Sequence, residues 1–397
     1  MGASSPHRRS NRSMNTPTHI PLRCWAEIDL AALERNLKSI QAKLPDRIKY
    51  IAVVKADAYG HGMQQVVARL MQAGVDMFAV ANITEAANIR EIGTGWPILV
   101  LGATLEDEES FLFEYDLIPT ISTIEEAKRL NKKAEARGKP LKAHLKVDTG
   151  MGRLGIWHEY ASELFEAFRQ SPFLELDGIF THFAAADQDI EFTRSQRRIF
   201  LDTIDRIEWL KKDDLLIHAD NSAGINTFAP DSVFNAVRIG LLQFGIRPYP
   251  TSIFADVETT PIFHFKSRVG VVKKLPAGAS ISYGRSRILE RDSEVAIVCA
   301  GYGDGVPLPL SNRGFVLIRG QRCPILGRVT MDQTIVDVTD LESSPQSGDP
   351  VTLIGEQESD AISLEEFAEW AQTISWEALC SVTKRVPRIY RTAIKTG

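Results

Sequence analysis

The chain has 397 residues, of which 44% are hydrophobic and 24% are charged. This balance is typical of folded globular proteins and excludes a disordered or fibrous chain. The length exceeds that of one ordinary single-core domain, but it suits a barrel of about 250 residues followed by a second domain of about 100–150. The net charge is −5, and no basic cluster is dense enough to bind a phosphate backbone, so nucleic acid is not an expected partner.

Residues 1–20 are polar and carry Arg8, Arg9 and Arg12 without any acidic residue. This composition favours a disordered N-terminal extension, with an organelle transit peptide as the alternative. The four cysteines are scattered, without the spacing of a zinc site or a disulfide framework. No apolar run approaches the ~18 residues of a membrane-spanning helix. We therefore expect a cytoplasmic protein without a metal site.

From about residue 46 to 250, short apolar runs rich in β-branched residues alternate with segments of helical period. The runs span residues 51–54, 76–80, 97–101, 117–121, 142–147, 178–182, 215–219 and 237–240. The helical segments span 63–73, 83–92, 124–136, 160–169 and 192–210. Runs this apolar indicate parallel strands covered on both sides, and eight strand–helix units predict an α/β fold of the (β/α)8 TIM-barrel type.

Beyond residue 250 the pattern changes to short segments separated by Gly, Pro and Asp turns. These segments span residues 269–273, 295–300, 315–319, 334–338 and 350–354. They predict a mostly antiparallel C-terminal β domain over residues 251–397, with one helix near 364–373. The barrel domain is then expected at 21–250, with its first strand, 22–29, as a candidate for pairing with the second domain.

Charged side chains gather at the expected carboxyl ends of the barrel strands, where barrel enzymes hold their active sites. Lys55 follows the first strand directly, where partial desolvation lowers the pKa of an ammonium group and makes it a nucleophile. The later positions are Lys146, Asp148 and Arg153 at the fifth strand, His182 at the sixth, Asp220 at the seventh and Arg238 in the eighth. This basic rim predicts an anionic ligand, although a lysine at a strand end, taken alone, is more often merely exposed.

A phosphate site is expected near the last two strands. Barrel phosphate sites usually form in the loops after strands seven and eight, against a helix N-terminus. Ser222 stands where it could cap the helix after strand seven, and Gly240 stands where backbone amides can approach a ligand closely. The alternative is an ordinary capping serine and a turn glycine.

Residues 150–155 match the dinucleotide fingerprint G-x-G-x-x-G, with a strand before them and a helix expected after them. The motif supports an alternative from another class, a nicotinamide-dependent oxidoreductase. However, it falls at the fifth strand–helix junction of a regular eightfold series rather than at the start of a Rossmann half, so it is weak evidence.

The segment A-V-V-K-A-D-A-Y-G-H-G at residues 52–62 resembles the pyridoxal-phosphate lysine motif of the alanine racemase family. Further motifs of that family follow in order: A-E-I-D-L at 26–30, K-V-D-T-G-M-G-R at 146–153, T-H-F-A at 181–184, N-S-A at 221–223, R-I-G at 238–240, S-Y-G at 282–284, G-Y-G-D-G at 301–305 and M-D at 331–332. The resemblance implies a pyridoxal-phosphate barrel with a C-terminal β domain. Related barrel decarboxylases share the lysine, but Y-G-H-G and S-Y-G favour the racemases.

By this resemblance the protein would be an alanine racemase, in which two groups carry protons on opposite faces of the α-carbon. Lys55 would hold the cofactor covalently and serve one face, and Tyr283 would serve the other across a homodimer interface. A phenol, whose ordinary pKa is near ~10, needs neighbours that lower this value. A histidine–arginine chain does so in the family, but His182 fits its histidine poorly, which leaves that link open.

Arg238 matches the family's arginine that faces the pyridine nitrogen. Because a guanidinium keeps its proton, that nitrogen stays largely unprotonated, which weakens the cofactor as an electron sink and suppresses transamination. A structural arginine paired with a carboxylate is the alternative.

The resemblance also implies the remaining binding residues. The cofactor contacts would be Tyr59, His182, Asn221, Ser222, Gly240 and Leu241. The substrate contacts would be Arg153, Tyr302 and Met331. Lys146 aligns with a lysine that is often carbamylated, which would make it an anion able to hold Arg153; an ordinary Lys146–Asp pair is the alternative.

The chain departs from the family pattern in three places. It has V-P-L at 306–308 where many members have an aromatic residue and an arginine, and Thr330 where a cysteine is common. It also has Lys384 where some members place a phosphate-binding tyrosine, so the phosphate would be held by fewer hydroxyls or by a lysine charge instead. The resemblance implies D-alanine supply for peptidoglycan, with a serine or broad-specificity racemase as the near alternative. A catalytically silent pyridoxal-phosphate-binding protein is a further alternative.

Overall fold

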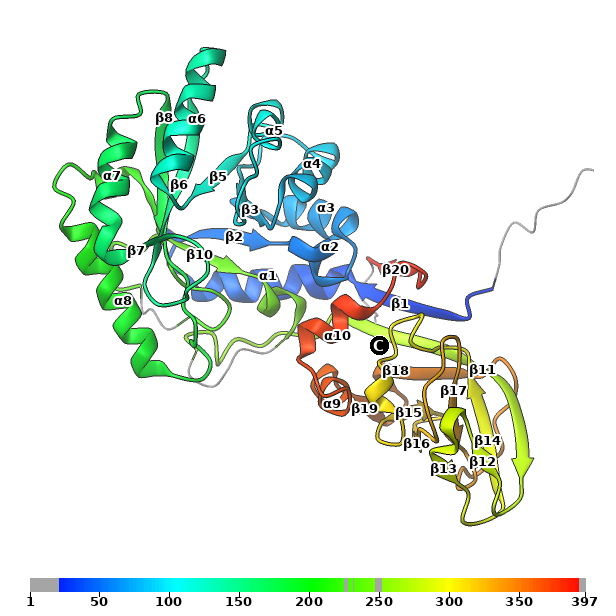
Figure 1. Ribbon diagram of the computed structural model, residues 1–397. Helices are drawn as coiled ribbons and strands as arrows, with labels where there is room; N and C mark the ends of the chain where they lie inside the picture. The colour runs from blue at the N-terminus through cyan, green and yellow to red at the C-terminus, as the bar shows by residue number, and fades with distance from the viewer. Residues whose placement is uncertain (1–20, 225–227, 231, 247–251, 393–397) are drawn as a thin grey trace, which may run out of the picture.

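A computed structural model describes residues 21–224, 228–230, 232–246 and 252–392 of the chain. A barrel surrounded by helices lies beside a second body built of strands, and the two are joined along α1 and β1 (Figure 1). The N-terminal extension expected at residues 1–20 lies outside the described residues. Among the described helices, none is long and apolar enough to cross a membrane.

Eight parallel strands form the barrel. They are β2 (Lys49–Val53), β3 (Met77–Val80), β4 (Ile98–Val100), β5 (Ile118–Ile121), β6 (Leu141–Asp148), β8 (Leu174–Phe180), β9 (Leu216–His218) and β10 (Ala236–Ile239). The sheet closes because β10 pairs with β2 and β5 pairs with β6, while the short β7 (Ile156–Trp157) adds to β6 outside the ring. Each of the eight strands overlaps a predicted run, so the predicted TIM-type barrel is confirmed.

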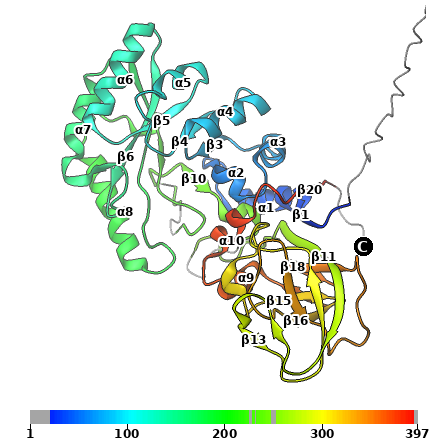
Figure 2. The same cartoon turned by 45° about the vertical axis from the view of Figure 1, so that its right-hand side comes forward.

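Helices cover the outside of the barrel (Figures 1 and 2). They are α1 (Leu30–Lys43), α3 (Met63–Ala73), α4 (Ile83–Ile92), α5 (Glu109–Glu114), α6 (Ile124–Arg137), α7 (Ala161–Arg169) and α8 (Ile190–Asp205), with the short α2 (Lys55–Tyr59) and the 3-10 turns η1 (His158–Tyr160), η2 (Lys212–Asp214) and η3 (Leu241–Phe244). Local sequence explains their bounds: α6, for example, begins at a capping box of Thr123 and Glu126 and ends at Gly138, which has a φ of 59°.

The second body is a mostly antiparallel sheet, as predicted. Its strands are β1 (Cys24–Asp29), β11 (Phe263–Leu275), β12 (Ser280–Ile281), β13 (Arg287–Ile288), β14 (Ser293–Val298), β15 (Phe315–Ile318), β16 (Gln321–Pro324), β17 (Thr334–Asp337), β18 (Pro350–Gln357), β19 (Asp360–Ile362) and β20 (Arg388–Arg391). The turns η4 (Tyr283–Arg285) and η5 (Leu308–Leu310) and the helices α9 (Leu364–Trp370) and α10 (Ser375–Ser381) complete it. The first strand, β1, pairs with β11 and β20, so the N-terminal segment belongs to this sheet. The domain division near residue 250 stays a prediction.

The interior of the barrel is divided into two halves. Because side chains alternate along a strand, one set from β2 to β5 and β10 meets inside as an apolar cluster that includes Ile51, Met77 and Leu99. On β6, β9 and β10 the corresponding inward positions hold polar side chains instead, among them His144 and His218, both fully buried. Polar groups inside a barrel require partners, and these partners connect the fold to the site.

Candidate active site

A cavity of about 680 Å³ opens at the carboxyl ends of the barrel strands. All but three of the predicted site residues line it: Lys55, Tyr59, Lys146, Arg153, His182, Asn221, Ser222, Arg238, Gly240 and Leu241. The barrel thus brings together residues from the ends of five strands, β2, β6, β8, β9 and β10. The C-terminal body closes one side of the cavity with Glu365, Ser375 and Trp376.

Lys55 stands at the start of a strained turn. The next residues, Ala56, Asp57 and Ala58, have φ values of 52°, 55° and 53°, a left-handed conformation that costs energy outside glycine. The carboxylate of Glu85 holds this turn, because it accepts hydrogen bonds from the amides of Ala56 at 2.7 Å and Ala81 at 2.8 Å.

Helix α10 fixes the same turn from the other side. An added Cβ at Gly60 would lie 2.6 Å from the carbonyl oxygen of Leu379, so only a glycine fits there. Burial, and next the positive charge of Arg153, lower the pKa of Lys55. A larger fraction of the amine is therefore unprotonated and nucleophilic.

Arg238 lies buried on β10, with its guanidinium held on several sides. It donates to Nδ1 of His218 at 2.6 Å and to the carbonyl oxygens of Thr181 at 2.9 Å and Ala219 at 2.8 Å. A further contact of 3.1 Å joins it to Nδ1 of His182. Burial lowers the pKa of Arg238 to about 10, so it remains a cation at neutral pH.

The histidine–arginine link that the sequence leaves open therefore exists between His182 and Arg238. Burial and the charge of Arg238 lower the pKa of His182 well below its ordinary value, so this imidazole is neutral. Within one chain the link does not continue to Tyr283, which is not among the residues lining the cavity.

The phosphate site predicted near strands seven and eight has the required donors, but its geometry differs from the expectation. The prediction that Ser222 caps a helix after strand seven is wrong, because the described residues between β9 and β10 form turns and bends. Ser222 Oγ instead accepts from the amides of Gly240 at 3.2 Å and Leu242 at 3.3 Å, at the start of η3. An added Cβ at Gly240 would lie 2.7 Å from the hydroxyl of Tyr59. Two hydroxyls and a set of amides therefore converge where glycine allows close approach.

Lys146 is a buried cation that lines the same cavity. Its ammonium lies 5.3 Å from the centre of the Phe180 ring, and none of the ion pairs between described residues involves it. Burial, followed by the charges of Arg238 and Arg153, lowers its pKa to about 8. The nearby carboxylate of Asp148 accepts backbone hydrogen bonds from Gly150, Met151 and Gly152.

The hydrogen bonds to Asp148 also bear on whether the fingerprint at residues 150–155 binds a dinucleotide. The loop amides that would bind a pyrophosphate already donate to Asp148. The helix expected after the motif is present as α7, but β7 and η1 separate it from the loop, so the loop amides do not stand at a helix N-terminus. The structure gives the oxidoreductase alternative no support.

Three predicted site residues lie elsewhere. Tyr283 is 71% exposed, Met331 53% and Tyr302 45%, and none of them lines the cavity. Tyr302 and Met331 are neighbours, since the amide of Gly303 donates to the carbonyl of Met331 at 2.8 Å. All three lie in the C-terminal body, and β12 and β13, which flank Tyr283, lie on its side away from the barrel (Figure 1).

The structure shows where two of the three departures from the family pattern lie. Val306 is completely buried, so its side chain does not line an entrance. Lys384 is exposed and is not among the cavity-lining residues, so within this chain the structure favours the alternative of fewer phosphate-binding hydroxyls over that of a lysine charge. Helix α10 brings Trp376 to the cavity instead.

The sequence missed several residues that shape the site. Phe180, the last residue of β8, lies under Lys146 and Arg238 at 5.3 and 5.2 Å. Glu85 and Trp376 act from helices that are distant in sequence, and no local motif marks them. His144 and His218 could have been noticed, because each is a polar residue that follows apolar residues in a strand expected to be covered on both sides.

The ends of the barrel strands bring together a desolvated lysine, a set of hydroxyls and amides suited to a phosphate, and a buried arginine. This combination is typical of the class of cofactor-dependent barrel enzymes. Comparison with known proteins narrows the class. Family models described as "Alanine racemase, N-terminal domain" and "Alanine racemase, C-terminal domain" match residues 28–248 and 262–390. The chain belongs to the alanine racemase family.

Individual relatives agree over nearly the whole chain. An alanine racemase from Halothermothrix orenii is 39% identical, with 97% of this chain and 99% of the relative aligned. The structure of alanine racemase from Bacillus anthracis with bound L-Ala-P has a TM-score of 0.86 and 33% identity, covering 94% of this chain and 96% of that one. The Bartonella henselae enzyme with covalently bound pyridoxal phosphate has a TM-score of 0.83 and 29% identity, covering 94% and 100%.

Proposed function

We propose that this protein is a pyridoxal-phosphate-dependent alanine racemase that interconverts L-alanine and D-alanine. The observation that carries the proposal is the position of Lys55. Its desolvated amine stands on a strained turn and lines the same cavity as the hydroxyls and amides that could bind a phosphate. Membership of the alanine racemase family supports the same reaction.

The residues of the cavity fit the cofactor. The hydroxyls of Tyr59 and Ser222 and the amides at Gly240 and Leu241 would hold the phosphate, while Lys55 would bind the aldehyde carbon. Because burial raises the pKa of Tyr59, its hydroxyl keeps its proton and can donate to a phosphate. His182 and Asn221 would border the ring. When bound there, the cofactor supplies an electron sink that makes the α-hydrogen of an amino acid acidic.

Arg238 would set the strength of that sink. It faces the cavity as a cation that keeps its proton, so it can donate to a ring nitrogen but cannot protonate it fully. A weaker sink favours the return of the proton to the α-carbon over transamination. His218 and His182 orient the guanidinium for this role.

The substrate would be oriented by Arg153, whose guanidinium can bind a carboxylate. Lys146 lies close enough to Arg238 and Arg153 that, after burial, their positive charges also lower the pKa of Lys146. An amine with a pKa of about 8 can react with carbon dioxide, and the resulting carbamate would be an anion suited to hold Arg153. We therefore propose that Lys146 is carbamylated.

Racemisation needs a proton carrier on each face of the α-carbon, because a single group tends to return the proton to the face it came from. Lys55 would serve one face through Nζ, and Tyr283 would serve the other through its phenol. Tyr283, Tyr302 and Met331 are exposed and outside the cavity of their own chain, which supports a homodimer in which each chain completes the site of its partner.

Supply of D-alanine for peptidoglycan in the cytoplasm is the role this reaction would serve. The four cysteines are all free thiols, which is typical of proteins in reducing compartments. Serine is the nearest alternative substrate, because it differs from alanine by one hydroxyl.

The reaction is tested by proton NMR of the purified protein with L-alanine in deuterated buffer, together with chiral chromatography. We expect deuterium at the α-carbon and growth of D-alanine to an equal mixture. Exchange without D-alanine would indicate proton transfer on one face only, and bound cofactor without exchange of any amino acid would indicate a binding protein without racemase activity. If the protein contains the cofactor and racemises serine, but gives neither deuterium exchange nor D-alanine with L-alanine, the protein is a serine racemase instead.

A further inference from the structure

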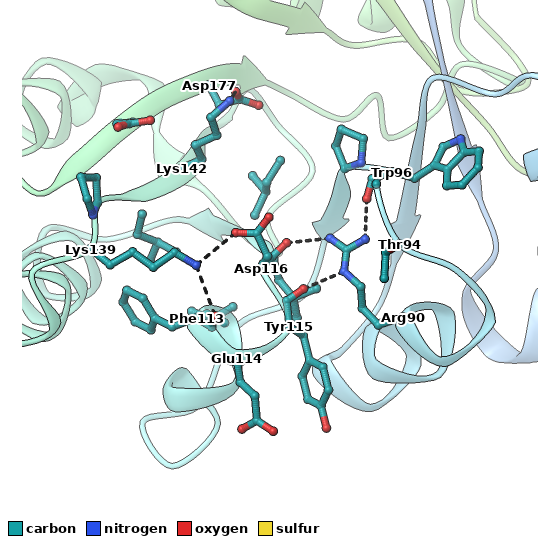
Figure 3. Close-up of a pocket in the computed structure, with 18 residues that line it drawn as sticks. Arg90, Thr94, Trp96, Phe113, Glu114, Tyr115, Asp116, Lys139, Lys142 and Asp177 are labelled. Carbon is teal, nitrogen blue, oxygen red and sulfur yellow. Dashed lines mark hydrogen bonds and ion pairs between the residues drawn. The ribbon is translucent and has the colours of Figure 1, made fainter.

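A line of buried polar side chains runs through the barrel from the active-site cavity to the opposite mouth. Nη1 of Arg238 lies 2.6 Å from Nδ1 of His218, and Nε2 of His218 lies 3.0 Å from Nδ1 of His144. Nε2 of His144 then lies 3.2 Å from Oδ2 of Asp177. Asp177 borders a second cavity, of about 580 Å³, at the amino ends of the strands (Figure 3).

The chemistry of the two ends determines the position of each hydrogen along this line. A guanidinium only donates, so Nδ1 of His218 must accept and its proton must reside on Nε2. That proton is donated to Nδ1 of His144, whose own proton then resides on Nε2. An ionised carboxylate only accepts, so Asp177 receives the last hydrogen bond. Both imidazoles are then neutral and carry their hydrogen on Nε2.

The electrostatics agree with this assignment. Burial is the main cause that lowers the pKa of both histidines, and the positive charge of Arg238 lowers them further. The hydrogen bond from His144 is the main cause that lowers the pKa of Asp177, and Lys142, 3.2 Å from its other carboxylate oxygen, acts in the same direction. Asp177 is therefore ionised and the histidines are not.

Packing prevents the rings from turning. The ring of Phe180 stacks on His218 at 4.8 Å and 11°, and it also lies under Arg238. Gly178 leaves room for His144 on the other side, because an added Cβ there would lie 2.6 Å from Cε1 of the imidazole. The line therefore has one arrangement and one direction, from the arginine to the carboxylate.

We propose that His144 and Asp177 are positioning residues for Arg238. From the far end of the barrel they fix the hydrogen of His218 on Nε2, and this leaves Nδ1 free to hold the guanidinium toward the cofactor site. The inference rests on the proposed function, in which Arg238 faces the ring of pyridoxal phosphate. It extends the functional residues through the full length of the barrel.

The first test measures the hydrogens directly. Long-range proton–nitrogen NMR of the protein labelled with 15N-histidine distinguishes the two neutral forms of imidazole from the doubly protonated form. His144 and His218, assigned by single substitution, are expected to be neutral with the hydrogen on Nε2 at pH 7. A doubly protonated His218, or a hydrogen on its Nδ1, would overturn the proposal whatever the activity of the enzyme.

The second test compares two substitutions at residue 144. Glutamine can accept from His218 and donate to Asp177, whereas leucine can do neither. We expect His144→Leu to lower kcat about tenfold with little change in KM, in the range found for outer partners of catalytic groups, and His144→Gln to restore most of it. Glu175→Gln is the control, because Glu175 is an exposed carboxylate on β8, the strand of Asp177, and among the described residues no hydrogen bond or ion pair joins it to His144.

The outcomes are separable. Equal kcat values for His144→Leu and His144→Gln would overturn the proposal. If His144→Leu does not fold, Asp177→Asn replaces it: loss of the charge is expected to lower kcat, and an unchanged kcat would count against the role of Asp177. A wild-type protein with the expected hydrogens but without activity on alanine would contradict the proposed function and leave the line of hydrogen bonds intact.

Discussion

The two ends of the barrel use the same kinds of residue for different purposes. Lys142 and Lys146 both belong to β6, but Lys142 forms an ion pair of 3.2 Å with Asp177, which is the main cause that raises its pKa. Lys146, toward the other end, is buried beside other cations, and its pKa is lowered to about 8. The lysine with a carboxylate partner is structural, and the lysine without one marks the ligand site.

Arginines show the same contrast. Arg90, at the amino end, donates to the carbonyl oxygens of Trp96, Tyr115 and Asp116, so it ties together the loops around the second cavity (Figure 3). Arg238, at the carboxyl end, divides its hydrogen bonds between carbonyls and imidazoles and remains next to the active-site cavity. Four cations, Lys55, Lys146, Arg153 and Arg238, line this cavity together with two carboxylates, Asp187 and Glu365. An excess of buried positive charge is costly, so it indicates an anionic ligand.

The largest effect is expected from Lys55→Ala at the carboxyl end. The loss of the amine removes both the covalent link to the cofactor and one proton carrier, so turnover should fall by at least about a thousandfold. Racemase assays and the visible absorbance of bound cofactor measure both losses. Lys139→Ala at the amino end is the matched control, because that lysine is half exposed and has only long contacts, 3.4 Å to the surface carboxylate of Asp116 and 3.5 Å to the carbonyl of Phe113; its turnover should stay within about twofold of wild type. Similar losses in both chains would remove the distinction between the two ends.

Tyr283→Phe should lower racemisation by about a hundredfold to a thousandfold while the cofactor remains bound. The phenol serves one face only, so exchange of the α-hydrogen in deuterated buffer should survive for one enantiomer and nearly disappear for the other. Proton NMR started from each pure enantiomer measures the two rates. Equal losses for L-alanine and D-alanine would contradict the assignment of two proton carriers.

Lys146→Met should stabilise the protein at neutral pH. The pKa of Lys146 falls from 10.5 to about 8 on folding, which corresponds to about 3 kcal/mol at 1.36 kcal/mol per pKa unit. Because the unfolded chain binds this proton more tightly, the penalty is complete below pH 8 and disappears as the pH rises toward 10.5. Urea unfolding of both chains in buffer free of carbon dioxide, at pH 7 and pH 10, measures it. A difference independent of pH would argue against a buried, titrating amine.

Arg90→Ala should produce the smallest effect. The three carbonyls lose a charged donor, but they lie near the surface and water can replace part of the contact. We expect a loss of about 2 kcal/mol in the free energy of unfolding, with turnover per folded protein unchanged. A loss of turnover without a loss of stability would show that the amino end contributes to the chemistry through Arg90.

Much of the barrel is predictable from sequence because most of its strands are short, largely apolar runs bounded by turns. The position of Lys55 is predictable for the same reason, since it follows such a run directly. The turn after it is not, because its left-handed residues depend on Glu85 and on Leu379 in α10, contacts that join distant parts of the chain.

Two further features escape the sequence. The helix expected after strand seven does not form in the described residues there, and Ser222 instead accepts from the amides that follow strand eight. The pattern shows that a serine can cap, but not which helix end lies beside it. The second is the line from Arg238 to Asp177, whose members come from four strands and meet only when the barrel closes.

The most direct test of the shared site is the mixing of two inactive chains. In the proposed homodimer, Lys55→Ala and Tyr283→Phe would each disable both sites of their own dimer, whereas a mixed dimer would combine the intact Lys55 of one chain with the intact Tyr283 of the other. With random exchange, half of the dimers are mixed and each has one complete site, so about a quarter of the wild-type activity should return. If native mass spectrometry shows mixed dimers and no activity returns, Tyr283 does not complete the site of the partner chain.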